Sequence, residues 1–358
     1  MMHPIYISAT SIISPQQNFE YEDFLQDIKS SDDGTLFIID PNYRDYINPV
    51  AIRRMSKMLK MGISTGMNCL QQAGITTPDA IITGTGRGSM VDMEQFLMDM
   101  IKLEEEALTP TAFIQSTYNS VNGWLALNTK CKGYNQTYVH RGTSFELALL
   151  DAQLLLNESN SYKNILVGCY DEITPDYIKV KSKIGYWKNP VPDSTLDLFK
   201  HNDTNGTIAG EGAAFFTITN NKEQTLCSIN TIKMLQDANI DDVNNSINEA
   251  LTANGMTLAD VDVLLCGMNG DARQQPMYNA IIENTESNTS IAAFKHLCGE
   301  YDTSSGFATW IASNIFKHQS IPEILLQKKG EHSSVKNILL VNSYILNSTS
   351  IILYRSIS

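Results

Sequence analysis

Positive charge, paired cysteines and long apolar runs are all scarce in this chain of 358 residues. Lysine and arginine number 26 against 39 aspartates and glutamates, and the one dense basic run is "RRMSKMLK" at 53–60. Because phosphate contacts require clustered lysine and arginine, the formal charge of -13 argues against a protein that binds nucleic acid.

The six cysteines stand singly, without a CxxC motif or a matched histidine pair, and this pattern predicts reduced buried thiols. No uninterrupted apolar stretch reaches the roughly 18 residues that a membrane span needs. The N-terminus also lacks a basic region and a cleavage site. We therefore expect a cytoplasmic protein without a membrane span. Carboxylates such as those of 260–271 lack the convergent spacing of a metal site, so we expect no metal and no other cofactor.

Short apolar strands alternate with helix-like segments along the whole length, which predicts an α/β fold. A helix is expected at 53–74, ended by Gly74, and another at 90–108, stopped by Pro110. The methionines of this second helix recur at helical spacing, which is typical of core packing.

Two further patterns concern organisation. The segment "YKNILVG" (162–168) is nearly repeated in "VKNILLV" (335–341), which suggests two related halves, 1–222 and 223–358. The loop "GTGRGS" (84–89) has GxGxG spacing instead of GxGxxG and no acidic residue at the right distance. It therefore indicates a tight structural turn rather than a dinucleotide site.

Several segments, in the same order over most of the chain, resemble the β-ketoacyl synthases of the thiolase superfamily. They are "IYISATSIISP", "IRRMSKMLKMGISTGMNCLQQAGI", "IITGTGRGS", "PTAFIQSTYNSVNGWLALNTKCKGYNQTYV", "NILVGCYDEITP" and "GTIAGEGAAFFTI". The resemblance implies the duplicated thiolase-like fold, a five-layer αβαβα arrangement with two mixed five-stranded sheets. It also implies a pair of buried helices, one starting near Gly142 and the other near Ser305.

The resemblance puts the family's nucleophilic cysteine at Gly142 of this chain, so the nucleophile is absent. The N-terminus of a buried helix supplies N–H groups and the positive end of a dipole, which would lower the pKa of a thiol and hold an oxyanion. Thr143 and Glu146 have the spacing of a capping box. Thr143 and Ser144 are candidate alternative nucleophiles, but helix capping and close packing explain these two residues more simply.

The family's two catalytic histidines are replaced as well. "VDVLLCGMNGDARQQP" carries Asn269 at the first position, and "FKHLCGEYDTSSG" carries Glu300 at the second while it keeps Lys295. His296 lies out of register and is interpreted as a structural side chain.

The resemblance leaves three residues as support for the site: Lys295, Glu211 of the Gly-Glu-Gly-Ala segment, and Tyr344. Tyr344 belongs to the family's final glycine-rich loop, which is altered here to "VNSYILNSTSIIL", with Ile345, Asn347 and Ser348 where glycines are usual. Four parts of one site have thus changed, and we read Gly142, Asn269 and Glu300 as vestigial positions.

These losses predict a non-condensing subunit that pairs with an active ketosynthase, or with itself, and shapes an acyl tunnel, as chain-length factors do. The resemblance suggests fatty-acid, polyketide or aryl polyene/flexirubin-type biosynthesis. Acyl carrier protein would be an indirect partner, because carrier proteins are themselves usually acidic. Two alternatives stay open: an acyltransferase, thioesterase or decarboxylase that uses Ser144 or Thr143 with Glu300 as base, and a free-standing acyl-binding protein.

Overall fold

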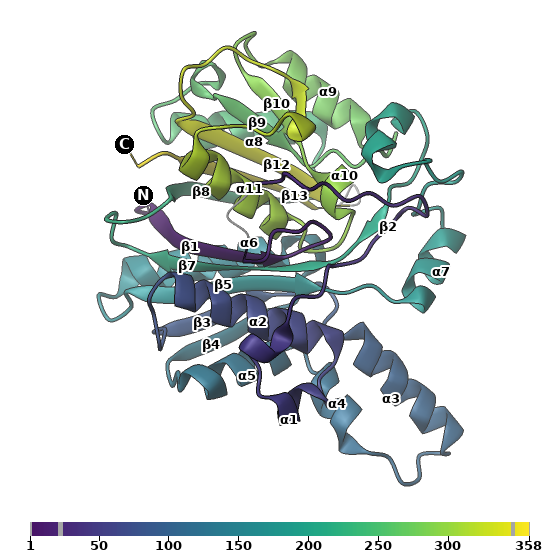
Figure 1. Cartoon of the computed structure of the whole chain (residues 1–358). Helices are drawn as coiled ribbons and strands as arrows, with labels where there is room; N and C mark the ends of the chain where they lie inside the picture. Colours follow the sequence, from purple (N-terminus) through teal and green to yellow (C-terminus); the bar gives the residue numbers. More distant parts are fainter. Residues whose placement is uncertain (1, 21–23, 345–347, 358) are drawn as a thin grey trace.

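Eleven strands form one continuous mixed sheet in the computed structural model, which describes residues 2–20, 24–344 and 348–357 (Figure 1). The strand order is β11-β10-β9-β12-β13-β8-β1-β7-β5-β3-β4. Strands β2 (Thr35–Leu36) and β6 (Ala209–Gly210) pair separately. The α/β class expected from the sequence is therefore confirmed.

The first half of the sheet contains β1 (Ile5–Ile13), β7 (Gly212–Thr219), β5 (Asn164–Asp171), β3 (Ala80–Gly84) and β4 (Tyr134–Tyr138). Every residue of β3 and β7 is buried, as expected of strands covered on both faces. Helices α2 (Lys57–Gln72) and α5 (Ser120–Thr129) pack on one face, and α6 (Ser144–Glu158) packs on the other.

The second half contains β8 (Cys227–Gln236), β13 (Ser348–Arg355), β12 (Asn337–Tyr344), β9 (Val263–Cys266), β10 (Ser290–Ala293) and β11 (Leu326–Lys328). Helices α8 (Ile240–Thr252) and α9 (Gln275–Glu283) cover its outer face, and α11 (Ser305–His318) covers its inner face. The remaining helices are α1 (Pro49–Ile52), α3 (Met90–Lys102), α4 (Pro110–Ser116), α7 (Pro175–Lys183) and α10 (Lys295–Cys298).

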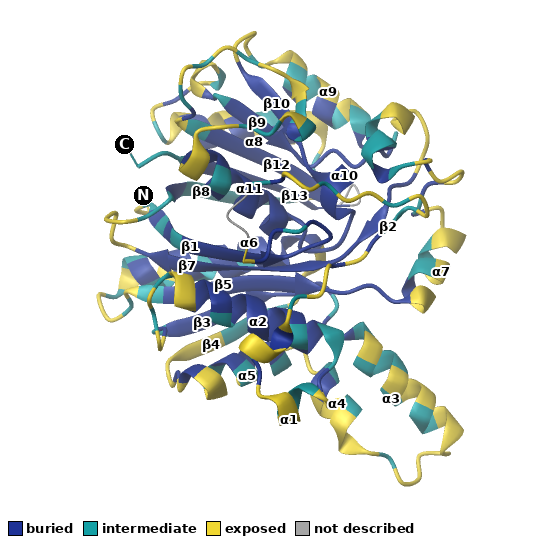
Figure 2. Ribbon diagram, viewed as in Figure 1, coloured by how far each residue is buried: buried dark blue, intermediate teal, exposed yellow. Residues whose placement is uncertain are grey.

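Helices α6 and α11 lie together in the interior, where Figure 2 shows α11 largely buried, and eight of the 15 residues of α6 are buried. Eleven of the 14 residues of α11 are buried, among them Gly306, Ala308 and Ala312, whose small size allows the close approach of neighbouring elements. Helix α6 starts at Ser144 and α11 starts at Ser305, so the predicted pair of central helices is found at the expected places.

The sheet count differs from the expected two five-stranded sheets. Residues Ile5–Ile7 of β1 pair antiparallel with Cys227–Ile229 of β8, and this short ladder joins the two halves into one sheet. Strand β11 adds a sixth strand to the second half. The division into five layers stays a prediction of the resemblance.

The interpretation of the methionine-rich segment as core packing is wrong. Helix α3 contains no buried residue, and Met98 is 49% exposed. Figure 2 shows that α3 and α4 project from the body of the protein. The six cysteines, in contrast, are all buried and free, as their spacing predicted. No helix in the described residues is long and apolar enough to cross a membrane.

Gly306 provides a test of the packing between α11 and β5. A Cβ at this position would lie 2.3 Å from Sγ of Cys169 and 3.2 Å from Cβ of Ala214. Gly306→Ala should therefore lower the free energy of unfolding by about 1–3 kcal/mol, although alanine favours helix. Gly123→Ala in α5, where a Cβ meets nothing within 4 Å, should raise it by up to about 1 kcal/mol. Denaturant titrations of both variants measure the difference, and equal stabilities would contradict the described packing.

Candidate functional site

The turn at Arg141–Thr143 joins β4 to α6 and holds the position where the resemblance places a cysteine. Gly142 is buried, and a Cβ built on it would lie 2.3 Å from Cβ and 2.5 Å from Cγ of Tyr344. The side chain of Tyr344, at the end of β12, therefore occupies the space that a cysteine side chain would take. Any residue larger than glycine would require Tyr344 to move.

The two hydroxyl groups beside Gly142 are held by the turn itself. Ser144 Oγ accepts a hydrogen bond from the N–H of His140 at 2.8 Å and donates one to the carbonyl of Arg141 at 2.8 Å. Thr143 Oγ1 donates to the carbonyl of His140 at 3.1 Å and lies 3.1 Å from Nδ1 of the same histidine. Ser144 is fully buried, and neither of these two bonds engages a base that could activate it.

The expected capping box at the start of α6 is wrong. Thr143 makes no side-chain cap bond, and Glu146 points into the interior, where neither carboxyl oxygen has a hydrogen-bond partner. Burial raises the pKa of Glu146, and the nearby hydroxyls of Ser350 and Ser305 oppose this shift. Hydrophobic packing of the first turn of α6 thus prevails over the local capping preference.

Lys295 and Glu300 form a fully buried ion pair at the head of the second central helix. Lys295 Nζ donates to both carboxyl oxygens of Glu300 at 2.8 Å and to the carbonyl of Ser343 at 3.1 Å. Asn269 Nδ2 donates to Glu300 Oε2 at 2.8 Å. Burial raises the pKa of Glu300, and the charge of Lys295 opposes that shift. Both oxygens of Glu300 are therefore engaged in binding its neighbours.

These contacts bring most of the predicted site residues together. Ser343 accepts from Lys295 and immediately precedes Tyr344, so the end of β12 connects the ion pair to the turn at Gly142. The other residues of the altered final loop are less informative: Ile345 and Asn347 lie outside the described residues, and Ser348 begins β13.

Two of the predicted residues have other roles. Glu211 accepts from the N–H groups of Ile38 at 3.0 Å and Ile173 at 3.1 Å, and it pairs with Lys57. It therefore holds loops together instead of contacting the ion pair. His296 bonds through Nε2 to the carbonyl of Ile324, and burial lowers its pKa to about 4. It is a structural histidine, as predicted.

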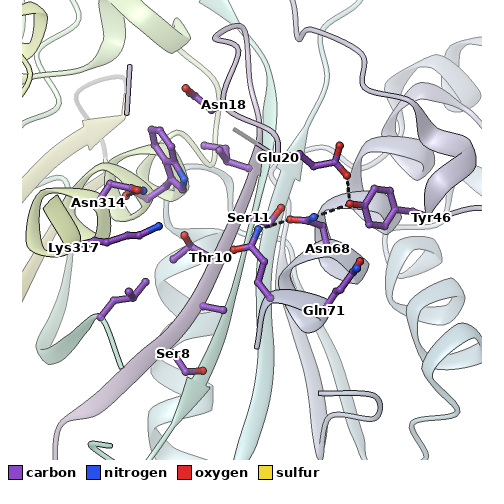
Figure 3. Close-up of a pocket in the computed structure, with 15 residues that line it drawn as sticks. Ser8, Thr10, Ser11, Asn18, Glu20, Tyr46, Asn68, Gln71, Asn314 and Lys317 are labelled. Atoms are coloured by element: carbon purple, nitrogen blue, oxygen red, sulfur yellow. Dashed lines mark hydrogen bonds between the residues drawn. The ribbon is translucent and has the colours of Figure 1, made fainter. Parts of the chain in front are cut away.

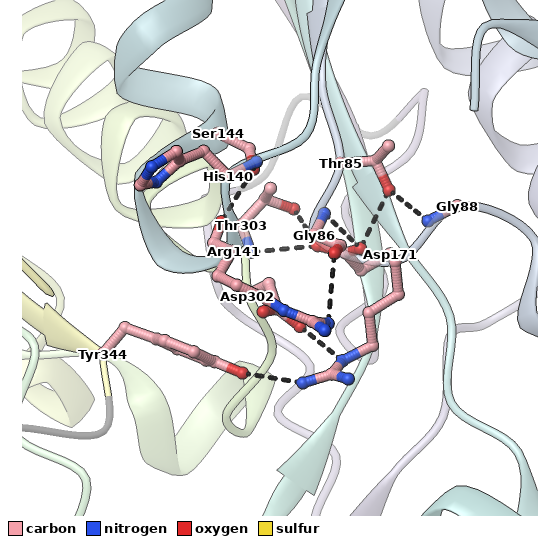
Figure 4. Close-up of polar contacts among 11 residues, drawn as sticks. Thr85, Gly86, Gly88, His140, Arg141, Ser144, Asp171, Asp302, Thr303 and Tyr344 are labelled. Carbon is pink, nitrogen blue, oxygen red and sulfur yellow. Dashed lines mark hydrogen bonds and ion pairs between the residues drawn. The ribbon is translucent and has the colours of Figure 1, made fainter. Parts of the chain in front are cut away.

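Figure 4 shows a second polar cluster that sequence reasoning missed. Arg87 Nε donates to Asp302 Oδ2 at 2.8 Å, Nη2 donates to the hydroxyl of Tyr344 at 3.2 Å, and the guanidinium stacks over the ring of Tyr177. Arg87 therefore fixes the far end of the ring whose near end covers Gly142. The glycine-rich loop that carries Arg87 was interpreted only as a turn, so its sequence gave no sign of this role.

Asp171 ties the same loop to the head of α11. It accepts from Thr85 Oγ1 and the N–H of Gly86, and from the N–H and hydroxyl of Thr303. Burial and the charge of Asp302 raise the pKa of Asp171 to about 7. A Cβ on Gly86 would lie 2.1 Å from Cβ of Asp302, so the loop packs directly on the site as a tight structural turn. Within the described part of the chain, no three His, Cys, Asp or Glu side chains converge on a possible metal position.

Residues 38–188 match the family model described as the N-terminal domain of β-ketoacyl synthase. This match covers less than half of the chain, and the matched segment is similar to that domain. No curated protein matches this sequence.

Solved structures show the same fold at low sequence identity. The ishigamide ketosynthase/chain length factor is 15% identical with a TM-score of 0.82, and the match covers 99% of this chain and 100% of that chain. A β-ketoacyl synthase from Burkholderia phymatum STM815 is 12% identical with a TM-score of 0.78, over 99% and 100% of the two chains. A structure of a type II polyketide synthase acyl carrier protein in complex with its ketosynthase is 14% identical with a TM-score of 0.72, and the match covers 99% of both chains.

Replacement of Gly142 tests the occupation of the nucleophile's place. Gly142→Cys should lower the free energy of unfolding by about 1–3 kcal/mol, because Cβ and Cγ of Tyr344 must move. The new thiol should be alkylated by iodoacetamide far more slowly than that of Gly123→Cys, which has open space around it. Adding Tyr344→Gly should speed alkylation at 142. Equal rates for Gly142→Cys and Gly123→Cys would show that the ring does not cover the site.

Glu172, next to Asp171, makes stability depend on pH. It accepts from Ser89 Oγ and the N–H of Val91, its second oxygen has no partner, and burial raises its pKa to about 7. Between about pH 4.3, the ordinary glutamate pKa, and pH 7, the folded chain binds a proton that the unfolded chain has lost. Stability should therefore fall as pH rises through this window.

Glu172→Gln should reduce that slope of unfolding free energy by up to about 1.4 kcal/mol per pH unit. The exposed control Glu105→Gln should leave it unchanged. Urea titrations at several pH values provide the measurement, and an unaltered slope in Glu172→Gln would refute the assignment.

Proposed function

We propose that this chain is a non-condensing ketosynthase-like subunit that pairs with an active ketosynthase and shapes the acyl tunnel of the pair. The observation that carries the proposal is the side chain of Tyr344 in the space beside Gly142. Gly142 provides no thiol, and the side chain of Tyr344 occupies the space that a cysteine side chain would need. Arg87 anchors the ring through the tyrosine hydroxyl, so the filling is a built feature of the site.

The ion pair supports the same proposal from the other side of the site. Condensation in the family requires neutral donors that stabilise developing oxyanions. Here Glu300 supplies a negative charge, and Lys295 and Asn269 are already bound to it. A carboxylate at this position would repel an enolate, and the three N–H groups of Lys295 already bind Glu300 and the carbonyl of Ser343.

An exposed apolar surface supports pairing with another subunit. We define the α3–α5 surface by its exposed side chains on α3, α4, α5 and the connected segments: Leu97, Met98, Ile101, Phe113, Ile114, Tyr118 and Leu127. Ile101 and Leu127 are each 74% exposed. Large apolar side chains exposed on neighbouring elements favour a protein–protein interface. Strand β4 next to them lies at the edge of the sheet and leads directly into the turn at Gly142, so a subunit bound here would reach the site.

An active ketosynthase subunit is the partner that we propose for the α3–α5 surface. The similarity of the fold to a ketosynthase/chain length factor favours this choice, and it suggests polyketide biosynthesis ahead of the fatty-acid or aryl polyene/flexirubin-type pathways. A homodimer is the other arrangement. The proposal includes two ketosynthase-like halves, 1–222 and 223–358, a cytoplasmic location, and contact with acyl carrier protein through the partner.

An acyltransferase, thioesterase or decarboxylase that uses Ser144 or Thr143 has less support. The hydroxyl of Ser144 is bound to backbone in both directions, and Glu300 has both oxygens engaged. No contact in the described residues links either hydroxyl to Glu300. A free-standing acyl-binding protein would leave the α3–α5 surface unexplained.

Purification of the tagged chain from its native host tests the pairing. A protein that reacts covalently with cerulenin and condenses acyl and malonyl thioesters should co-purify, and the tagged chain alone should do neither. Ile101→Glu with Leu127→Glu should remove that partner, because charges are placed in an apolar interface. Leu154→Glu, on the outer part of α6, is the matched control. Condensation by the chain alone, or an acyl adduct mapped to Thr143 or Ser144, would overturn the proposal.

A further inference from the structure

A polar cavity of about 590 Å³ lies beside β1, away from the site at Gly142 (Figure 3). Strand β1 pairs with β8 only at Ile5–Ile7. Beyond Ile7 the outer edge of β1 borders the cavity instead of a neighbouring strand, and α2 and α11 form the two side walls. The volume falls within the range of roughly 300–1,000 Å³ that is typical of small-molecule sites.

The cavity is lined mainly by neutral hydroxyl and amide side chains. They include Ser8, Thr10, Ser11, Asn18, Asn68 and Asn314. Lys317 and Glu20 carry the two charges among the lining residues, and their signs cancel. Such a lining gives no net attraction for an ion, and its apolar part is limited to Ala9, Ile12, Leu226 and Trp310. It matches a neutral molecule that both donates and accepts many hydrogen bonds.

Ser11 has the property that distinguishes a binding site from a solvated crevice. Its residue is 3% exposed, and its Oγ has no hydrogen-bond partner in the described residues. A buried hydroxyl without a partner is unfavourable in the folded protein. Ser11 lines the cavity, and a rotation of its side chain would bring Oγ within reach of a ligand hydroxyl there.

Asn68 on the α2 wall is held in one orientation. Gln72 Nε2 donates to Asn68 Oδ1 at 2.6 Å, and Asn68 Nδ2 donates to the hydroxyl of Tyr46 at 2.7 Å. The Tyr46 hydroxyl in turn donates to Glu20. Figure 3 shows Lys317 and Asn314 reaching in from α11 on the opposite side. A rigid helix therefore supplies each wall, as pre-organised recognition requires.

We propose that this cavity binds a small neutral polyhydroxylated molecule of the sugar class. Hydroxyls on adjacent carbons of such a molecule can bond to Ser11 and to the amides at the same time. The site shares no residue with the turn at Gly142 or with the ion pair, so the proposal is independent of the proposed function.

The test uses D-glucose, D-galactose and myo-inositol as probes with the full chain, measured by saturation-transfer NMR and calorimetric titration. At least one probe should bind. Ser11→Ala should weaken that binding roughly fivefold, as expected for one lost hydrogen bond. The melting temperature of Ser11→Ala should stay equal or rise, because an unpartnered buried hydroxyl is removed. Acetate and hexanoate, a short-chain and a longer-chain carboxylate, are the comparison probes and should not bind.

Ser64→Ala is the matched control. Ser64 lies on α2, is fully buried and has an unpartnered Oγ, but it does not line the cavity. This variant should keep wild-type affinity for the probe. Absence of binding by all three hydroxylated probes would overturn the proposal. Equal affinity of Ser11→Ala and Ser64→Ala would overturn it too, because the bound probe would then lie elsewhere.

Discussion

The buried ion pair of Lys295 and Glu300 is the constraint on which the arrangement of the site depends. Removing two charges from water is costly, and the cost is offset only when the geometry is good and the remaining hydrogen-bonding groups are satisfied. Here Asn269 and the carbonyl of Ser343 complete the set. The ion pair thereby ties three segments together: the loop after β9, the α10 segment and the end of β12.

The position of Tyr344 follows from this arrangement. Because Ser343 is held by Lys295, the next residue is directed towards the start of α6, and Arg87 binds its hydroxyl. A site that could have held an activated thiol is thus filled by a ring that is anchored at both ends. The proposed loss of condensation chemistry would be distributed over four segments of the site, so the reversal of any one of them would leave the others in place.

The sequence predicted the parts of this molecule that depend on local pattern and order along the chain. The α/β class, the two buried helices and the structural role of His296 follow from apolar periodicity and from the resemblance of segments such as "FKHLCGEYDTSSG". The sequence did not predict features that are determined by contacts between residues distant in the chain. The packing of Tyr344 on Gly142 and the burial of Glu146 each depend on neighbours that lie far away in the sequence. A capping-box spacing or a run of methionines gives no information about which face the fold will cover.

The short ladder between β1 and β8 bears on how the two halves of the sheet are coupled in folding. Three residue pairs contribute little to the mutual orientation of the halves, whereas α6 and α11 share a continuous apolar core with both. Cooperativity between the halves therefore resides in side-chain packing and not in the hydrogen-bonded sheet. A defect in the central helices would uncouple the halves into separate folding units while each part of the sheet kept its own ladder.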